Sequence, residues 1–599
     1  MSKFLGNFPL RLSLCLVATL STSSFAQEKK GLTSSPSCNP ENAFAILERQ
    51  TAATKTFDDQ VERIAVLIRA ADLLWPLQQE NARAVFTEAF ELAKQHYKEK
   101  GDDPSREGHF LMISVPDQRF VVIQAIAKRD LAWAKKLIAE ILNEQQLEAR
   151  EKNDKNARQE KTAEKLLGLA STLAASDQPA ALSFARSSLQ YPATMYLPLF
   201  LYRLSEIDHV ASYQFYQEAL AAYSRSPMPR LLYLSSYPFG NNREVGEMPG
   251  YTIYKVPTGF APNPNLQRLF VQVLLNRVQQ RLAEPAETLA GGDISEAGQM
   301  WLALTRLEKQ ILHSLPDLAP KVEQAKSSLF PLLSQRSQGQ VARIISEQSA
   351  PIKNFSDQVE EAEKNPNVDR RDQQLVFAVT RASTNDELDL VLRVVDKISD
   401  SAVRAQLLNW IYFSRTQTAI KNKQLTEARK LAAKVAELDQ RGYLYFQIAE
   451  QTLKESVDQT QAREMLEEVV DNAAKAPATL VTARTQLGAA YLYTKIDLNR
   501  AIAVLGDAVK SINRLEQPDF SRQFVMRKIE GKTFGSFASF QTPGFDPEKT
   551  FRELGKSDFD GTLYQASNFT NKFLRARTSL ALIEPCLQQP EQMKKKAKK

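Results

Sequence analysis

The stretch LGAAYLYTKIDLNRAIAVLGDA, residues 487–508, has two apolar segments on either side of a short polar turn. On both sides of Asp497, apolar and small residues recur at the three- and four-residue spacing of a helix. Small residues such as Gly488 and Ala501 let two antiparallel helices approach closely. The stretch therefore predicts a helical hairpin. One such hairpin cannot bury its apolar face alone, so neighbouring hairpins must stack on both sides of it.

The same stretch resembles the tetratricopeptide repeat, in which leucine-glycine and tyrosine on a first helix precede alanine, a large apolar residue and alanine on a second. The matching residues are Leu487, Gly488, Tyr491, Ala501, Leu505 and Ala508. The gap from Gly488 to Ala501 is one residue longer than in that family, and Asn513 stands about where the family has a closing proline. The resemblance implies an all-α fold, an α-solenoid of antiparallel helix pairs.

Related arrangements recur along the chain, each with an aspartate, a small residue four positions later and an apolar residue one turn further on. The aspartates are Asp130, Asp177, Asp208, Asp458 and Asp497. We expect each to cap the N-terminus of a helix rather than to donate a proton. Ala428, Ala462 and Ala501 are 34 and 39 residues apart, close to the tetratricopeptide period.

With 599 residues, the chain is too long for one globular core, and its helical bias favours an elongated array over several domains. The predicted organisation is a signal peptide at 1–26, a disordered leader at 27–42, an irregular helical-repeat region at 43–355, a more regular one at 372–515, a hairpin with closing helices at 516–590 and a lysine-rich tail at 591–599.

An insertion at residues 233–265 interrupts the helical pattern, because its prolines and glycines forbid a long helix. Aromatic and charged residues alternate within it, and long irregular insertions are often functional. Two interpretations are open: the rings fill the groove of the solenoid, or they line a ligand site. The candidate partner-binding residues are Tyr237, Phe239, Arg243, Tyr251, Tyr254 and Phe260.

A second departure surrounds the glycine-rich segment near residues 522–540. Apolar residues alternate on its near side, which favours a strand over a helix. We therefore predict a small β-hairpin that turns near Gly531 and Lys532.

The first 26 residues are typical of a secretory signal. Lys3 and Arg11 precede a short apolar run, which ends in small residues before Gln27. Cys15 lacks the small residue before it that a lipoprotein signal requires, so cleavage is expected. No later apolar stretch approaches the roughly 20 residues of a membrane span. We expect an exported protein, periplasmic or extracellular, that is not integral to the membrane.

After removal of the signal, two cysteines remain, Cys38 and Cys586, and an oxidising compartment permits them to pair. A disulfide requires its Cα atoms to lie within about 7 Å. About a dozen helix pairs, stacked at roughly 10 Å each, place the ends on the order of 100 Å apart. An intramolecular bond would require the array to curl until its ends meet. Two unpaired thiols, or pairing between molecules, are therefore expected instead.

The formal net charge of +7 is accounted for by Lys3, Arg11 and the five lysines within residues 594–599. The body of the chain is neutral and has no basic footprint for phosphates, so no nucleic-acid partner is expected. The lysine tail is typical of a solvated end, with a tether to an anionic envelope surface as the alternative.

Catalytic motifs are absent from the sequence. There is no phosphate-binding loop and no nucleophile elbow, and the four histidines lack the spacing of a metal pair, so neither metal nor cofactor is expected. The remaining enzyme hypothesis is action on cell-wall or other glycans, with Glu244, Glu247, Asp546 and Glu548 as the acids to test. The preferred hypothesis is a non-enzymatic scaffold that binds a protein or peptide, with a glycan as a further possible partner.

Overall fold

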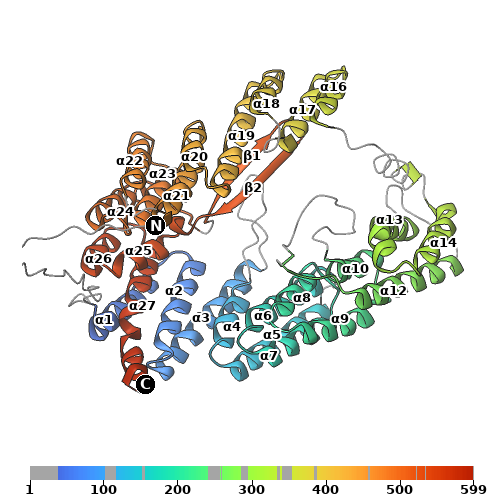
Figure 1. The fold of residues 1–599 in the computed structure, drawn as a ribbon. Coiled ribbons are helices and arrows are strands. Elements are labelled where there is room, and N and C mark those ends of the chain that lie inside the picture. Colours follow the sequence, from blue (N-terminus) through green and yellow to red (C-terminus); the bar gives the residue numbers. More distant parts are fainter. Residues whose placement is uncertain are drawn as a thin grey trace, which may run out of the picture.

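The structure is a computed structural model that describes residues 38–101, 117–151, 156–240, 256–257, 259–284, 295–333, 338–339, 354–382, 387–455, 459–520, 523–532 and 534–597. Helices dominate it, and the one sheet in these ranges is a two-stranded antiparallel hairpin. The expected all-α helical-repeat fold with a small β-hairpin is therefore confirmed. Figure 1 shows two arms of stacked helices.

The N-terminal arm comprises the helices that precede residue 334. They are α1 (Pro40–Ala53), α2 (Gln60–Leu74), α3 (Gln79–Lys100), α4 (Gln118–Ala127), α5 (Leu131–Glu151), α6 (Asn156–Leu173), α7 (Gln178–Ser188), α8 (Tyr196–Ser205), α9 (His209–Tyr223), α10 (Met228–Leu232), α11 (Ser236–Phe239), α12 (Pro264–Ala283), α13 (Glu296–Ser314) and α14 (Ala319–Leu329). Helix α1 thus begins inside the range predicted as a leader.

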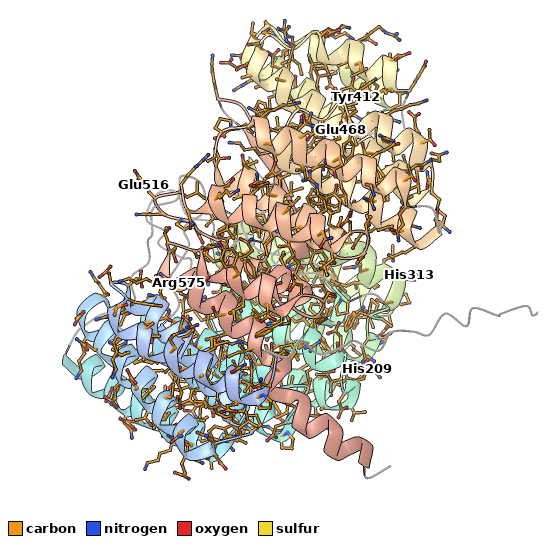
Figure 2. The ribbon with its side chains drawn as sticks, turned by 90° about the vertical axis from the view of Figure 1, so that its left-hand side faces the viewer. His209, His313, Tyr412, Glu468, Glu516 and Arg575 are labelled. Atoms are coloured by element: carbon orange, nitrogen blue, oxygen red, sulfur yellow. A yellow bond between two sulfur atoms is a disulfide. The ribbon has the colours of Figure 1, made fainter. Side chains whose placement is uncertain are left out.

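The C-terminal arm comprises the helices from residue 355 onward. They are α16 (Phe355–Glu363), α17 (Val368–Ala382), α18 (Leu388–Val395), α19 (Ser401–Lys421), α20 (Leu425–Ala432), α21 (Leu438–Glu455), α22 (Thr460–Lys475), α23 (Leu480–Tyr493), α24 (Leu498–Ile512), α25 (Pro547–Gly555), α26 (Phe559–Ser567) and α27 (Lys572–Ala597). Figure 2 shows both arms from the side, with Tyr412 and Glu468 on this arm and His209 and His313 on the other.

The helices stack in two rows. The first row runs α17, α19, α21, α23, α25, α27, α2, α4, α6 and α8, and each helix packs against the next. Each first-row helix also packs against a partner in the second row, in the order α18, α20, α22, α24, α26, α1, α3, α5, α7 and α9. The array therefore runs through both arms without a break, but it does not follow chain order: α27 and α1 form one pair in its middle.

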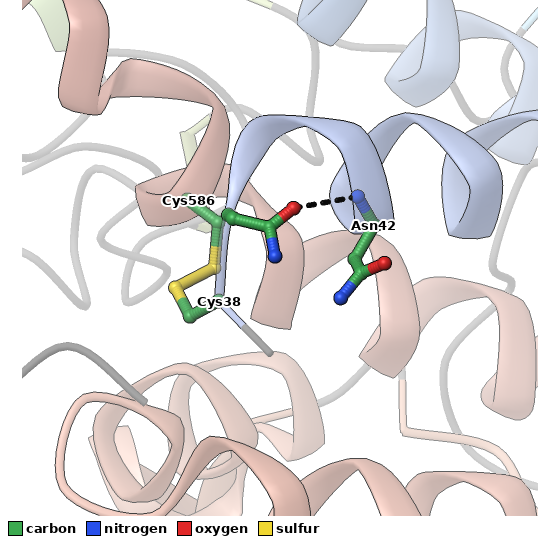
Figure 3. Close-up of a disulfide and its surroundings, with 4 residues drawn as sticks. Cys38, Asn42 and Cys586 are labelled. Atoms are coloured by element: carbon green, nitrogen blue, oxygen red, sulfur yellow. Dashed lines mark hydrogen bonds between the residues drawn. A yellow bond between two sulfur atoms is a disulfide. The ribbon is translucent and has the colours of Figure 1, made fainter. Parts of the chain in front are cut away.

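The pair α27–α1 is a helical hairpin made from two distant parts of the chain. The disulfide Cys38–Cys586, with Cα atoms 5.2 Å apart, stands where a loop joins the two helices of other pairs (Figure 3). At the opposite end of α1, Lys572 Nζ donates to the carbonyl oxygen of Thr56 at 2.9 Å, so the two helices run antiparallel. Figure 3 also shows the capping of α1 by Asn39, whose Oδ1 accepts from the backbone N–H of Asn42 at 2.9 Å.

The expectation of unpaired or intermolecular cysteines is therefore wrong. It assumed that the order of helices in the stack equals their order in the sequence. Instead, α14 and α16, which lie at the two tips of the stack, belong to neighbouring parts of the sequence, whereas α1 and α27 meet in the middle. Glu584 of α27 reinforces this junction by accepting from Arg69 of α2 at 2.6 Å and from Arg552 of α25 at 3.0 Å.

The small residues and aspartates of the repeat pattern lie where the sequence predicted. Ala134, Ala181, Ala462 and Ala501 have no exposed surface. Four of the aspartates accept hydrogen bonds from backbone amides of the first turn that follows; these are Asp130, Asp177, Asp208 and Asp497, at distances of 3.0 to 3.1 Å. Asp458 lies outside the described residues. These contacts confirm that the four aspartates are structural caps.

The predicted hairpin is present as β1 (Phe524–Glu530) and β2 (Gly535–Gln541), which pair Phe524 with Gln541 and Glu530 with Gly535. It lies in the connection between α24 and α25, beside α17 and α19 in Figure 1. In the described part of the chain, no helix is both long and apolar enough to cross a bilayer.

Candidate binding surface on the C-terminal arm

The first-row helices of the C-terminal arm are covered by another segment of the same chain, which comprises β1, β2 and the turn after them. Strand β1 contacts α19 and α21, and the 3-10 turn η4 (Pro543–Phe545) that follows β2 contacts α23. The segment crosses three successive helix pairs in a largely extended form. This face of the array is therefore already occupied along three units.

Side chains of the helices bind the backbone of the segment. Gln440 of α21 donates through Nε2 to the carbonyl oxygen of Met526 at 3.0 Å, and Gln406 of α19 accepts through Oε1 from the N–H of Glu530 at 2.7 Å. Asn409 orients Gln440, because its Nδ2 donates to Gln440 Oε1 at 2.6 Å. The helices thus recognise an extended backbone by its own donors and acceptors.

Arg527 anchors the centre of the hairpin. Its Nη1 donates to the carbonyl oxygen of Trp410 at 3.3 Å and to Ser414 Oγ at 2.5 Å. Its guanidinium carbon lies 3.5 Å from the ring centroid of Trp410, and the rings of Phe413 and Phe540 lie at 5.1 and 5.5 Å. In the described ranges, no carboxylate forms an ion pair with it, and the aromatic faces offset part of the desolvation cost. Burial lowers the pKa of Arg527 to about 10, so the side chain stays charged at neutral pH.

A stack of rings joins the hairpin to two helices. Phe413 of α19 and Tyr443 of α21 lie parallel, with centroids 5.8 Å apart. Phe540 of β2 packs on both of them, at 4.9 and 5.8 Å. Offset rings at these distances add to the energy of apolar burial. The hairpin is therefore held by packing as well as by hydrogen bonds.

The glycine of the repeat motif allows the segment to approach α23. A Cβ at Gly488 would lie 2.4 Å from Cε2 of Phe446, and a Cβ at Gly544 would lie 2.9 Å from the Cα of Gly488. Phe545 then packs edge to face on Phe446, with centroids 6.4 Å apart. Gly488 thus serves both the contact between two first-row helices and the crossing of the segment.

A shallow depression of about 280 Å³ lies at the turn of the hairpin. Its charged groups have partners: Asp372 accepts from Arg371 at 2.9 Å and from the N–H of Ser399 at 2.8 Å, and Asp369 lies 3.5 Å from Lys532. These charged groups are therefore already engaged within the fold.

Two of the candidate partner-binding residues are core residues. Tyr237 has no exposed surface, its hydroxyl lies 2.7 Å from Ser212 Oγ, and burial raises its pKa to about 12. Phe239 is 2% exposed and packs on Phe270. Phe260, partly buried, packs on Tyr237 at 5.2 Å. The prediction of partner contact is corrected for Tyr237 and Phe239, which fill the core where the regular stack ends. Arg243, Tyr251 and Tyr254 lie outside the described residues.

The acids of the enzyme hypothesis have structural partners where they are described. Asp546 caps α25 by accepting from the N–H of Glu548 at 2.9 Å, and Glu548 accepts from Arg577 Nε at 2.6 Å. Glu244 and Glu247 lie outside the described residues. No group of three metal-ligating side chains occurs in the ranges that the structure describes.

A comparison with protein-family models finds no match to this chain, and a comparison with curated proteins finds no similar one. The fold by itself defines the class: a helical-repeat protein whose first-row face carries a β-hairpin of its own chain.

Proposed function

We propose that this protein is an exported, non-enzymatic scaffold that binds an extended segment of a protein partner in the cell envelope, on the hairpin-covered face of its C-terminal arm. The observation that carries the proposal is the mode in which α19 and α21 hold β1. Gln406 and Gln440 bind backbone groups of the strand, and the rings of Trp410 and Phe413 bind its side chains.

Repeat arrays suit this role because each helix pair adds a strip of side chains to one continuous surface. The tetratricopeptide resemblance of residues 487–508 supports the same reading, since the matching Gly488 lies at the crossing of the segment. Membership of that family is part of the proposal.

Export is supported by the Cys38–Cys586 disulfide, because such bonds persist in oxidising compartments and are rare in the cytosol. The predicted signal peptide at 1–26 lies outside the described residues. When the full chain is expressed, we expect the protein in the medium or the periplasm. The recovered chain should lack residues 1–26 and keep Cys38.

The test is site-specific photo-crosslinking in cells. A benzoylphenylalanine replaces Phe537, an exposed ring on the hairpin, and in a matched control it replaces Tyr564, an exposed ring on α26 of the second row. We expect a defined protein adduct from position 537 and none from position 564. Equal adducts at both positions, or none at 537, would contradict the proposed surface.

A further inference from the structure

The two edges of the hairpin differ in what their backbone groups contact. The N–H of Gly531 donates to the carbonyl of Phe534, and the N–H of Thr542 donates to the carbonyl of Gln523. Because hydrogen-bonded pairs alternate along an antiparallel ladder, Ser536, Ala538 and Phe540 turn their backbone groups toward β1. The alternate residues of β2 turn theirs to the outer edge.

The helices bind some of the backbone groups on the outer edge of β1. The carbonyl of Met526 accepts from Gln440, and the N–H of Glu530 donates to Gln406. The outer edge of β2 presents the N–H and C=O groups of Gly535, Phe537, Ser539 and Gln541. Among the described residues, none of these groups has a hydrogen-bond partner.

The side chains of β2 lack the features that natural proteins use to protect an edge. Its sequence, GSFASFQ, contains no charged residue and no proline. Its residues alternate between exposed and half-buried, and Phe537 is 43% exposed. Exposed edges are usually blunted by lysine, proline or a bulge, because an unprotected edge pairs with another strand. The packing of Phe540 and the anchoring of Arg527 keep this edge in place.

We propose that β2 is the docking edge for a strand of the partner, which adds to the hairpin as a third strand. This inference rests on the proposed function and specifies its mode of binding. The occupant is an uncharged, extended segment of about seven residues, the length of β2, with an apolar side chain beside Phe537. Only an extended backbone supplies donors and acceptors at the two-residue repeat of the edge.

A single segment fits this place better than a second whole copy of the chain. Figure 1 shows the hairpin on the side of the C-terminal arm that faces the N-terminal arm, so a second copy would have to enter between the two arms. The absence of charge on β2 disfavours a charged ligand such as an acidic peptide or a phosphate group.

The test uses Ser539→Pro in the full chain, with Ser539→Val as the matched control. Proline removes the outward N–H of residue 539 and leaves the ladder with β1 intact, since proline is tolerated in edge strands on the solvent side. Valine keeps the N–H and favours a strand. The probe is the fluorescein-labelled peptide Thr-Val-Thr-Val-Thr-Val-Thr, and binding is followed by fluorescence anisotropy.

We expect the wild-type chain and Ser539→Val to bind the peptide with similar affinity, and Ser539→Pro to bind it at least tenfold more weakly. Saturating peptide should slow amide exchange of Phe537, Ser539 and Gln541 in the wild type and leave that of Phe540 unchanged. Unchanged circular dichroism and melting temperature show that Ser539→Pro is folded.

Two results would overturn the edge as the docking site: equal binding by the proline and valine variants, or no slowing of exchange in the wild type. If the adduct from position 537 persists in a Ser539→Pro background, the scaffold function survives and strand addition fails. If both the adduct and peptide binding are absent in the wild type, the proposed function fails as well.

Discussion

Arg527 is a buried cation whose partners are aromatic rings and neutral oxygens. The guanidinium is planar and weakly hydrated, so it stacks on Trp410 and still donates to the oxygens of Trp410 and Ser414. Lysine lacks the planar group that stacks on the ring, and its ammonium is more strongly hydrated. The charge lies at the centre of β1 and therefore fixes which residues of the strand face the helices.

Removal of Arg527 is expected to detach the hairpin without unfolding the arms. Arg527→Ala loses contact with three rings and two hydrogen bonds, and we expect it to lower the stability of the hairpin by about 2 to 4 kcal/mol. Amide hydrogen exchange should become faster in residues 524–541 and stay unchanged in α22 and α24. Arg527→Met, which keeps the apolar stem, is the control and should cost less than half as much; a larger cost would mean that charge, not packing, holds the strand.

Asp439, in the first turn of α21, is expected to make stability depend on pH. Burial raises its pKa to about 6, and the charge of Glu437 adds to the rise. The folded state therefore holds a proton that the unfolded state has released, and stability falls as pH rises from about 4 to about 6.

Asp439→Asn removes this cost because the amide stays neutral. We expect the variant to gain about 2 to 3 kcal/mol in free energy of unfolding at pH 7.5, since each unit by which the pKa is raised costs the ionised carboxylate about 1.4 kcal/mol. Denaturant melts at pH 3.5 and 7.5 measure the difference. If the gain is equal at both values of pH, it does not come from the ionisation of Asp439. It would then come from another effect of the substitution on the N-terminus of α21.

At the scale of elements, the hairpin could be predicted because alternation and the glycine turn are local signals. The predicted turn at Gly531 and Lys532 agrees with strands that end at Glu530 and begin at Gly535. The caps at Asp177 and Asp497 were also predictable, since a cap depends on the few residues that follow it.

The proposed binding surface was not predictable from the same local signals. The alternation of Val525, Arg527 and Ile529 places Arg527 on the buried face of β1, which is a recognisable anomaly. Its partners, Trp410 and Ser414, lie more than 110 residues away in the sequence. Conversely, the aromatic residues Tyr237 and Phe239 suggested a site because their own segment does not show that α9 and α12 bury them.

The hairpin is expected to behave as one unit, and Ala538→Pro tests this. Residue 538 faces Arg527 in the register and turns its N–H toward β1, so proline there removes a bond inside the ladder. Amides of both strands should lose protection together, while far-ultraviolet circular dichroism keeps the signal of the helices. Loss of protection confined to residues 537–539 would show that the helices, not the pairing of strands, hold β1.

At the scale of the whole molecule, the stack is permuted relative to the sequence. Local periodicity identifies helix pairs but carries no information on which pair follows which, so the closure by α27 and α1 could not be predicted. Cys586 is fully buried in the core that these two helices share with α2.

Reduction of the disulfide is expected to weaken the junction of the two arms. Cys586→Ser should lower stability by about 2 to 5 kcal/mol, the usual cost of losing a native disulfide. Amide exchange in α1 should rise most, since α1 is otherwise held by side-chain packing, by the hydrogen bond from Lys572 to Thr56 beyond its C-terminal end and by the short link to α2. A melting temperature that does not change with dithiothreitol would show that packing alone closes the array.

The placement of α1 and α27 also fixes a sequence of events during synthesis. Ala43, Leu47 and the other apolar residues of α1 are synthesised long before the helix that covers them, since α1 ends at Ala53 and α27 begins at Lys572. Until α27 is made, the apolar face of α1 has no helix to pair with. The nascent chain must therefore keep that face away from water during the synthesis of both arms, and the arms can fold before the central pair joins them.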